Sequence, residues 1–468
     1  MELIESARDW CQEQFASADF GNVARARRAS LMLRRVLERP SGRMTEVFDD
    51  GAERQAAYKF VEGKTAPAAI THALAEATLR QLADEPHVFV PVDGTSLSLT
   101  DRGGIKGFGS IGMRRLPTRG LKVIDALAVR RDGTTLGLLD LEWWSRAPRK
   151  RGSRARRRRL NQTEMHHWVD GIERVRSLFR GMSCVPWFLL DAEGDASTVL
   201  RSLLGGGCHF TVRVSQRARP VVQGPKRKTA LGRHMQRRPV LGTRTIVVPE
   251  APGRRARLAV LDVRAARVWL ELPAYEHSGR TLVGLHVVWA REHRAPHGEK
   301  PIEWMLLTDR PTESFEQACE VLDSYRQRWR IEEFHRAWKS ICRVEDTQLR
   351  AKDHVLRWAT LLAAVATRAE QLKQLARNKP EMLASEVFND VELRALIAMK
   401  RKQKKRTETV TDEVPTIATA VLWLAELGGY TGKSSGGPPG AITIGRGLER
   451  HAIWADAFAT SEELRRKT

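Results

Sequence analysis

The distribution of apolar residues predicts helical, then mainly β, then helical regions along the chain. To about Ala75, apolar residues recur with the helical period. In "DFGNVARARRASLMLRRVLERPSG" we expect Leu31, Val36 and Leu37 on one apolar side, with arginines around the rest. The C-terminal part has the same period, broken by "MKRKQKKRTET" and by the Gly/Pro-rich "GGYTGKSSGGPPG".

The region between them reads as strands and helices in a defined order. "HVFVPVDGTSLSL" predicts a strand, and "LKVIDALAVRRDGTTLGLLDLEWW" predicts two strands joined at Asp132-Gly133. The segments that follow are the helix "EMHHWVDGIERVRSLF", the strand "CVPWFLLD", the helix "DASTVLRSLLGGG" and the strand "CHFTVRVSQ". Three strands, a helix, a strand, a helix and a fifth strand is the order of a ribonuclease-H-like α/β core. Residues 217–300 are again β-like, which predicts an inserted sheet.

After the strand and turn of "PIEWMLLTDRP", the segment "TESFEQACEVLDSYRQRWRIEEFHRAWKSI" predicts one long helix. At about 100° per residue, four polar side chains share one stripe of this helix. They are Tyr325, Arg328, Glu332 and Lys339. The opposite, apolar face consists of Ile331, Phe334 and Trp338. Because Glu333 lies off both faces, helical phase favours Glu332 as the functional acid.

Two further acids are in apolar strands. Asp93 follows Val88, Phe89 and Val92, which we expect to be buried, and Asp191 ends "VPWFLL". Burial disfavours a lone carboxylate unless it is paired or binds a cation. Two acids from central strands and one from a late helix would suit a divalent metal site with oxygen ligands. Two Mg²⁺ ions about 4 Å apart could then activate a nucleophile and stabilise the leaving oxygen of a phosphodiester.

Plainer interpretations of these acids stay open. Glu332 could pair with Arg328 or Arg336 at helical spacing, which stabilises a helix by only a few tenths of a kcal/mol. Asp191 could cap a helix, although Asp195 is better placed for that role.

The charge of the chain narrows the class of partner. Lys and Arg number 79 against 56 Asp and Glu, for a net charge of +23. Such an excess favours a polyanion, most simply nucleic acid; the alternative is a solvated, Arg-rich surface. The strongly basic loop at residues 149–159 allows the same two interpretations: it either binds DNA or is a solvated loop.

The cysteines and the N-terminus bear on the cellular compartment. The five cysteines are scattered and show no metal-binding or disulfide pattern, which fits a reducing cytoplasm. The N-terminus has no signal-peptide core, and no apolar run approaches the length of a membrane span. We therefore expect a cytoplasmic protein with no membrane association.

Several motifs resemble one protein family. "DGTSLSL", "DAEGD" and the Y-x2-R-x3-E-x6-K spacing of "YRQRWRIEEFHRAWK" resemble the bacterial DDE transposases of the insertion-sequence-four family, over nearly the whole chain. The resemblance implies an α/β fold with a ribonuclease-H-like catalytic core. It further implies a helical domain that binds DNA ends (1–75), a catalytic domain (76–372) with a β insertion at about 217–300, and a helical dimerisation domain (373–468).

The resemblance also assigns roles to individual residues. Asp93, Asp191 and Glu332 would be the catalytic, metal-binding triad. The residues that would hold the DNA backbone beside the cleavage site are Tyr325, Arg328, Lys339 and Arg213. The residues implied in contacts with the transposon end are Trp304, which would receive a flipped base, Trp329 as a second aromatic, and Arg25 and Arg28. The chain departs from the family pattern in lacking the usual Arg after Asp191 and in having Gly94 after Asp93.

The activity implied is cut-and-paste transposition by a homodimer in a synaptic complex. The protein would bind terminal inverted repeats of double-stranded DNA, cleave in trans with two Mg²⁺ ions (Mn²⁺ can substitute), pass through a hairpin and join 3′ ends to target DNA. A bacterial cytoplasmic protein, nucleoid-associated when bound to DNA, would fit this role. The alternatives are a catalytically silent DNA-binding regulator derived from a transposase, and a ribonuclease-H-like nuclease acting on branched or hybrid nucleic acid.

Overall fold

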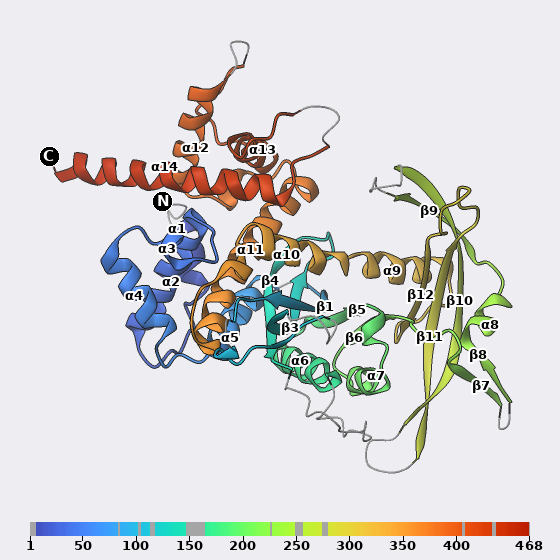
Figure 1. Cartoon of the computed structure of the whole chain (residues 1–468). Coiled ribbons are helices and arrows are strands. Elements are labelled where there is room, and N and C mark those ends of the chain that lie inside the picture. Colours follow the sequence, from blue (N-terminus) through green and yellow to red (C-terminus); the bar gives the residue numbers. More distant parts are fainter. Residues whose placement is uncertain are drawn as a thin grey trace. The chain divides into compact units, whose positions relative to one another are not determined.

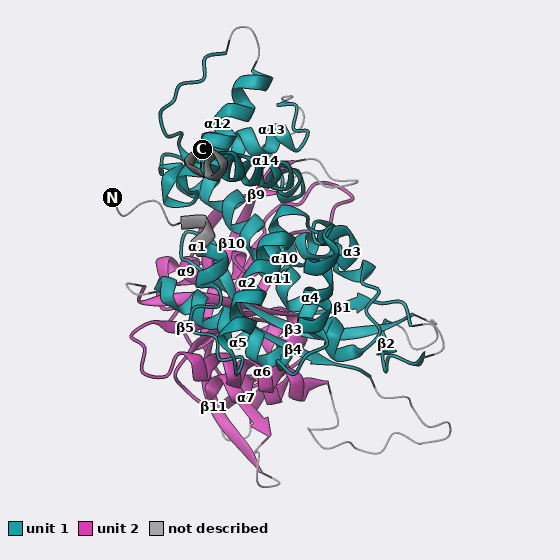
Figure 2. Cartoon of the chain, turned by 90° about the vertical axis from the view of Figure 1, so that its left-hand side faces the viewer, with its two compact units in different colours: residues 1–83, 94–153, 330–468 teal, residues 84–93, 154–329 magenta. Residues whose placement is uncertain are grey.

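The chain forms two compact units in a computed structural model that describes residues 6–82, 85–101, 104–112, 118–146, 164–224, 227–248, 256–273, 279–404, 408–432 and 437–467 (Figures 1 and 2). The first unit comprises residues 1–83, 94–153 and 330–468, and the second comprises residues 84–93 and 154–329. Strand β1 (His87–Ser98) contributes its first residues to the second unit and its last residues to the first.

The first unit begins with helices, as predicted: α1 (Ser6–Glu13), α2 (Val23–Glu38), α3 (Met44–Val47), α4 (Gly51–Val61) and α5 (Pro67–Leu79). Helix α2 starts where the side chain of Asn22 accepts a hydrogen bond from the amide of Ala24. The prediction for its apolar side was right for Val36 and wrong for Leu31, which is 46% exposed, while Leu37 is half-buried. The buried stripe is Ala29, Met32, Leu33 and Val36, at helical spacing i, i+3, i+4, i+7.

The strands of the first unit form the predicted hairpin. Strands β3 (Arg119–Val129) and β4 (Thr135–Trp144) pair antiparallel, and the short β2 (Gly109–Ser110) pairs with β3. The connecting turn needs Gly133, whose φ of 88° is strained for residues with a Cβ. Asp132 supports the turn because its Oδ1 accepts a hydrogen bond from the amide of Thr134.

The C-terminal part of the first unit is helical, as expected. Helices α10 (Trp329–Ser340, entering this unit at Arg330), α11 (Lys352–Asn378), α12 (Asp390–Gln403), α13 (Ile417–Leu427) and α14 (Ala441–Lys467) follow one another. Helix α11 is buried along most of its length and packs on β4, α2 and α5. Helix α12 includes the first five residues of the basic segment predicted as a break, whereas the segment 428–440 does separate α13 from α14.

Helices α13 and α14 approach closely through glycine. A Cβ added at Gly447 would lie 1.7 Å from the carbonyl oxygen of Leu424. A Cβ at Gly428 would lie 1.9 Å from the carbonyl oxygen of Thr443. Only glycine therefore fits at either point of contact.

The second unit is built on a mixed sheet. Strand β1 pairs in parallel with β5 (Val185–Leu190), which pairs in parallel with β6 (His209–Arg213). Strand β6 pairs antiparallel with β12 (Glu303–Thr308). Helices α6 (Met165–Leu178) and α7 (Ser197–Leu204) pack on each other and occupy the two predicted positions in the chain. Trp187, Phe188 and Phe210 are fully buried in this core.

The segment predicted as an inserted sheet is mainly β. Strands β7 (Pro220–Gly224), β8 (Arg227–Ala230), β9 (Gly242–Val248), β10 (Arg257–Pro273) and β11 (Arg280–Glu292) lie between β6 and β12 in the chain. The long strands β10 and β11 pair antiparallel, and β11 also pairs with β12. The short helix α8 (Leu231–Gln236) interrupts the strands.

The prediction of one long helix around Tyr325 is wrong. Helix α9 (Phe315–Arg326) starts at a capping box formed by Ser314 and Gln317, and α10 starts at Trp329. Between them the amides of Gln327 and Arg328 bond to carbonyl oxygens three residues earlier, which is the tighter 3₁₀ pattern. The residues on either side of this turn therefore cannot be assigned to one continuous helical stripe.

No helix in the described parts of the chain is both long enough and apolar enough to cross a membrane. All five cysteines are free thiols, four of them buried.

Candidate active site

Asp93 and Asp191 lie at the same edge of the sheet in the second unit. The last parallel pair between β1 and β5 is Val92 with Leu190, and each aspartate is the residue that follows. As predicted, Val88, Phe89 and Val92 are buried, so the strand holds Asp93 rigidly. The carboxyl ends of adjacent parallel strands present neighbouring side chains, so the backbone itself places two carboxylates together.

The capping alternative for Asp191 is partly right. Its Oδ1 accepts a hydrogen bond of 2.8 Å from the amide of Glu193 and caps the 3₁₀ turn Ala192–Gly194. This bond fixes the side chain through one carboxylate oxygen. Asp195, expected as the better cap, does not cap α7; its carboxylate instead accepts from Ser215 and pairs with Arg219 at 2.6 Å.

A largely buried arginine lies beside the first acid. Nη1 of Arg328 is 3.4 Å from Oδ2 of Asp93, and the two side chains are 11% and 16% exposed. The guanidinium also lies 5.9 Å from the ring centroid of Tyr325 and 5.8 Å from that of Trp329. Arg328 is thus a cation held in place by Asp93 and by two aromatic rings.

Tyr325 is the centre of the polar cluster in this unit. Burial raises the pKa of its phenol, the positive charges of Arg328 and Arg213 oppose the rise, and the negative charge of Asp191 adds to it. Its ring lies 6.2 Å from that of Trp304, at an edge-on angle of 65°. The second unit therefore contains seven of the predicted site residues: Asp93, Asp191, Arg213, Trp304, Tyr325, Arg328 and Trp329. Of the two predicted base-binding tryptophans, Trp304 is half-buried and Trp329 is 51% exposed.

The first unit holds Glu332 and Lys339, both on α10. The predicted apolar face of this helix is confirmed, since Ile331, Phe334 and Trp338 are fully buried. Lys339 donates hydrogen bonds of 2.9 Å from Nζ to Oγ1 of Thr95 and to the carbonyl oxygen of Ser96. This lysine is tied to the part of β1 that directly follows Asp93 in the chain.

Glu333 belongs to an ion-pair network inside the first unit. Its carboxylate pairs with Arg330 at 2.8 Å and with Lys373 at 3.1 Å, and Lys373 also pairs with Glu370. Burial acts to raise the pKa of Glu333, but the charges of Lys373 and Arg330 outweigh it and hold the pKa below its usual value. These contacts explain Glu333 as a structural residue and leave Glu332 as the candidate ligand of the pair.

A buried His–Asp pair was missed by the sequence analysis. Nε2 of His335, on α10, lies 2.9 and 2.8 Å from the two carboxylate oxygens of Asp125, which is fully buried in β3. Burial raises the pKa of Asp125, and the charge and hydrogen bond of His335 oppose the rise. The signal was present in "VIDALAV", an acid inside an apolar strand, which is the pattern that identified Asp93.

Three further residues that could be metal ligands lie in the first two turns of α6. The ligand atoms of His166, His167 and Asp170 all lie within 4.8 Å of one another. The two histidine rings are 3.8 Å apart. His166 and Asp170 have the helical spacing i and i+4, which is the signal in the sequence that could have predicted them.

The predicted end-binding arginines lie on α2. Arg25 is exposed and donates a hydrogen bond of 2.8 Å to the carbonyl oxygen of Phe20, whereas Arg28 is half-buried. The basic loop 149–159 lies outside the described residues.

Comparison with known families bears directly on this arrangement. Residues 7–65 match the family model for transposase DNA-binding, and residues 162–368 match that for the transposase DDE domain. The chain carries a DDE transposase domain. This DDE domain includes Asp191 and Glu332, and Asp93 precedes its first matched residue. The DNA-binding match covers α1 to α4 and therefore both Arg25 and Arg28.

Together the two domains support a DNA transposase that binds DNA. DDE domains normally use divalent metal ions, and the carboxylates described above are oxygen donors of the kind such ions prefer.

Proposed function

We propose that this protein is a cut-and-paste DNA transposase of the insertion-sequence-four family. The observation that carries the proposal is the pairing of Val92 with Leu190, because it sets Asp93 and Asp191 side by side next to Arg328. The antiparallel β3–β4 hairpin and the parallel pairing of β1, β5 and β6 support a ribonuclease-H-like core.

Asp93, Asp191 and Glu332 would hold Mg²⁺, as two ions for which Mn²⁺ can substitute. When bound, the metal would lower the pKa of water and stabilise the leaving oxygen of the phosphodiester. The second unit has a positively charged cluster formed by Arg328 and Arg213 around Tyr325. This cluster would fix a phosphate for in-line attack. Lys339 would add a further phosphate contact.

The reaction begins when water attacks the phosphorus at the transposon end and the 3′ oxygen leaves with a proton. The freed 3′ hydroxyl then attacks the opposite strand to close a hairpin, and after the hairpin is opened it attacks target DNA. Each step replaces one oxygen on the phosphorus by another, from water in the first cleavage and in the opening of the hairpin and from the 3′ hydroxyl in the other two steps, so no covalent protein–DNA intermediate forms. Trp304 would receive a base flipped from the end, and Trp329 would be a second aromatic nearby.

The remaining parts of the proposal concern the whole assembly. Residues 1–75, with Arg25 and Arg28, would bind the terminal inverted repeats, residues 76–372 would perform the chemistry, and residues 373–468 would dimerise. Two copies would pair two ends in a synaptic complex and cleave in trans. This role places the protein in the bacterial cytoplasm, on nucleoid DNA when bound.

The test is Mg²⁺-dependent cleavage and strand transfer on the DNA that flanks the gene. We expect the wild type to cleave and Glu332→Gln to lose activity by at least about 10³-fold while still binding the ends. Glu333→Gln is the matched control, with the same chemical change one residue away, and should keep cleaving once its folding is verified. Loss of cleavage in Glu333→Gln alone would refute the assignment of Glu332.

The same assay distinguishes an active transposase from the main alternative, a catalytically silent regulator. A catalytically silent regulator would bind the end DNA in a gel-shift experiment and give no cleavage with Mg²⁺ or Mn²⁺ in the wild type.

A further inference from the structure

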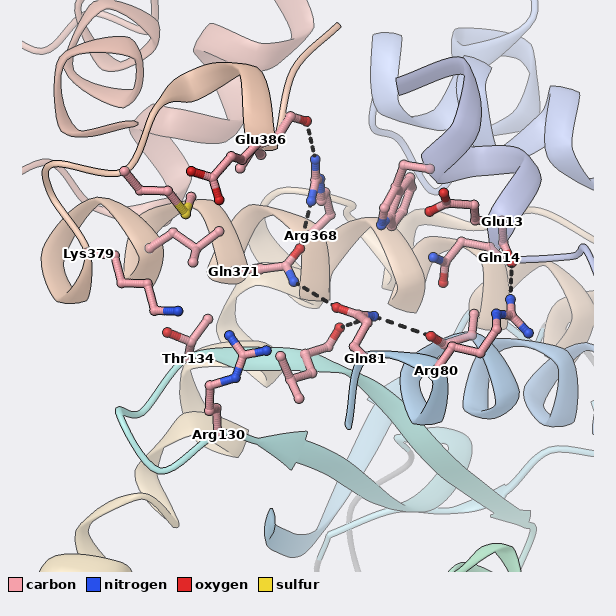
Figure 3. Close-up of a pocket in the computed structure, with 16 residues that line it drawn as sticks. Glu13, Gln14, Arg80, Gln81, Arg130, Thr134, Arg368, Gln371, Lys379 and Glu386 are labelled. Carbon is pink, nitrogen blue, oxygen red and sulfur yellow. Dashed lines mark hydrogen bonds between the residues drawn. The ribbon is translucent and has the colours of Figure 1, made fainter. Parts of the chain in front are cut away.

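A cavity of about 560 Å³ lies wholly within the first unit (Figure 3). Its walls come from α1, the end of α5 with the 3₁₀ turn Arg80–Leu82, the β3–β4 hairpin, α11 and the segment that follows α11. Its volume is in the range of small-molecule sites in proteins. None of the residues proposed above for DNA cleavage lines it.

The lining has an excess of positive charge. Four cationic side chains, Arg80, Arg130, Arg368 and Lys379, face two acidic ones, Glu13 and Glu386. In Figure 3, Lys379 and Arg130 project toward the same part of the cavity, next to Thr134. Arg130 and Thr134 belong to the β3–β4 turn, and Lys379 lies at the end of α11. Two cations and a hydroxyl make this corner suitable for an anionic group such as phosphate.

The opposite part of the cavity is preorganised by hydrogen bonds. Arg368 donates a hydrogen bond of 2.7 Å to Oε1 of Gln371 and one of 2.9 Å to the carbonyl oxygen of Val387. Gln371 in turn donates to Gln81, and Gln81 donates to the carbonyl oxygen of Leu136 (Figure 3).

The cavity also has an aromatic and apolar wall. The guanidinium of Arg368 lies 5.4 Å from the ring centroid of Trp10. The apolar residues that line the cavity with Trp10 are Ala77, Leu136, Leu375, Met382 and Val387. A flat, apolar ring with polar edges fits such a wall, since the side-chain amide of Gln14 also lines the cavity.

We propose that this cavity is a binding site for a nucleoside phosphate, with its phosphate between Lys379 and Arg130 and its base against Trp10 and the apolar wall. The ligand would contact α1, which is in the DNA-binding match, and α11, which is in the DDE match as far as Arg368. Binding would therefore stabilise the first unit and raise its melting temperature.

The experiment is calorimetric titration of the full chain, without DNA, with AMP, adenosine and inorganic phosphate. We expect AMP to bind saturably, and adenosine and phosphate each to bind at least about tenfold more weakly, since each makes only part of the contacts. Lys379→Gln and Arg130→Gln should each weaken AMP binding about tenfold. Lys59→Gln removes an exposed lysine outside the cavity and should leave binding unchanged.

The competing outcomes are decisive. Absence of saturable AMP binding, or wild-type affinity in both cavity variants with their folding intact, would overturn the site. Phosphate binding as tightly as AMP would overturn the role of the base. Arg328→Ala should bind AMP normally; if it did not, the nucleotide would be bound at the DNA-cleavage site and the cavity proposal would be wrong. Loss of DNA cleavage has no bearing on these titrations, so the two proposals fail independently.

Discussion

Nη1 of Arg328 lies 3.4 Å from Oδ2 of Asp93, and a neighbouring tyrosine and tryptophan flank the same guanidinium. A carboxylate proposed to bind metal is thus held by a cation before any ligand arrives. Arg328, which fixes the carboxylate of Asp93, is also proposed to bind the DNA phosphate. A single side chain would therefore position both the metal-binding acid and the phosphate.

The first prediction concerns this arginine. Arg328→Ala should lower the rate of end cleavage by about 10²-fold or more, because a fixed charge at a developing phosphate charge contributes on this scale. The measurement is single-turnover cleavage with Mg²⁺ at saturating protein. Arg326→Ala is the control. Arg326 is two residues away and 56% exposed, and its ion pair with Asp323 is long, at 3.7 Å. Its loss should therefore change the cleavage rate about twofold at most. Equal losses in the two variants would contradict the role of Arg328.

The second prediction concerns Glu333. Glu333→Gln should lower the free energy of unfolding by about 1–3 kcal/mol, because Lys373 and Arg330 would lose a shared, largely buried partner. Denaturant unfolding followed by circular dichroism measures this change. Glu332→Gln is the comparison, and we expect it to lower the free energy of unfolding by less than Glu333→Gln does. A reversed order of the two stabilities would show that Glu332, and not Glu333, is the structural acid.

The sequence was sufficient for the order of elements because that order depends on local patterns. The apolar strand before Asp93, the Asp132-Gly133 turn and the apolar face of Ile331, Phe334 and Trp338 are each encoded within about ten residues. The acid inside "VIDALAV" was encoded equally clearly, yet its partner His335 is 210 residues away and only the fold brings them together.

The errors occurred where tertiary contacts decide the local structure. No glycine or proline marks the turn at Gln327 and Arg328, and the helical period continues through it. The turn allows Arg328 to contact both Asp93 and Tyr325, a pairing that depends on residues far apart in the chain. Helical phase remains valid within α10, where Glu332 and Lys339 are two turns apart, but it does not connect them to Tyr325.

The third prediction tests the His335–Asp125 pair. His335→Ala should destabilise the protein by about 3–5 kcal/mol, because it leaves the fully buried carboxyl group of Asp125 without its paired histidine. Adding Asp125→Asn should recover part of the loss, and the double-mutant cycle gives the coupling energy. The control is His293→Ala, an exposed histidine 3.2 Å from Asp262, which should cost less than about 1 kcal/mol. Strictly additive effects at His335 and Asp125 would show that the pair is not coupled.

The last prediction is a pH dependence that originates at Glu392. Burial raises the pKa of this carboxyl from 4.5 to about 7, although its hydrogen bond from the amide of Asn389 and the charges of Arg368 and Arg34 oppose the rise. Between about pH 4.5 and 7 the folded protein holds a proton that the unfolded chain has released. The stability contributed by this group is therefore present below pH 4.5, falls as the pH rises to about 7, and is constant above that.

Glu392→Gln cannot ionise, and its amide oxygen can still accept the hydrogen bond from Asn389. The variant should match the wild type in unfolding free energy near pH 4 and exceed it at pH 8 by up to about 3 kcal/mol. Denaturant unfolding at a series of pH values measures this difference, and comparing the two proteins cancels the contribution of the buried His451, whose own pKa is lowered by burial. Glu381→Gln, at an exposed acid, should show no such pH-dependent difference. A constant offset between Glu392→Gln and wild type from pH 4 to 8 would mean that Glu392 ionises alike in the folded and unfolded chain.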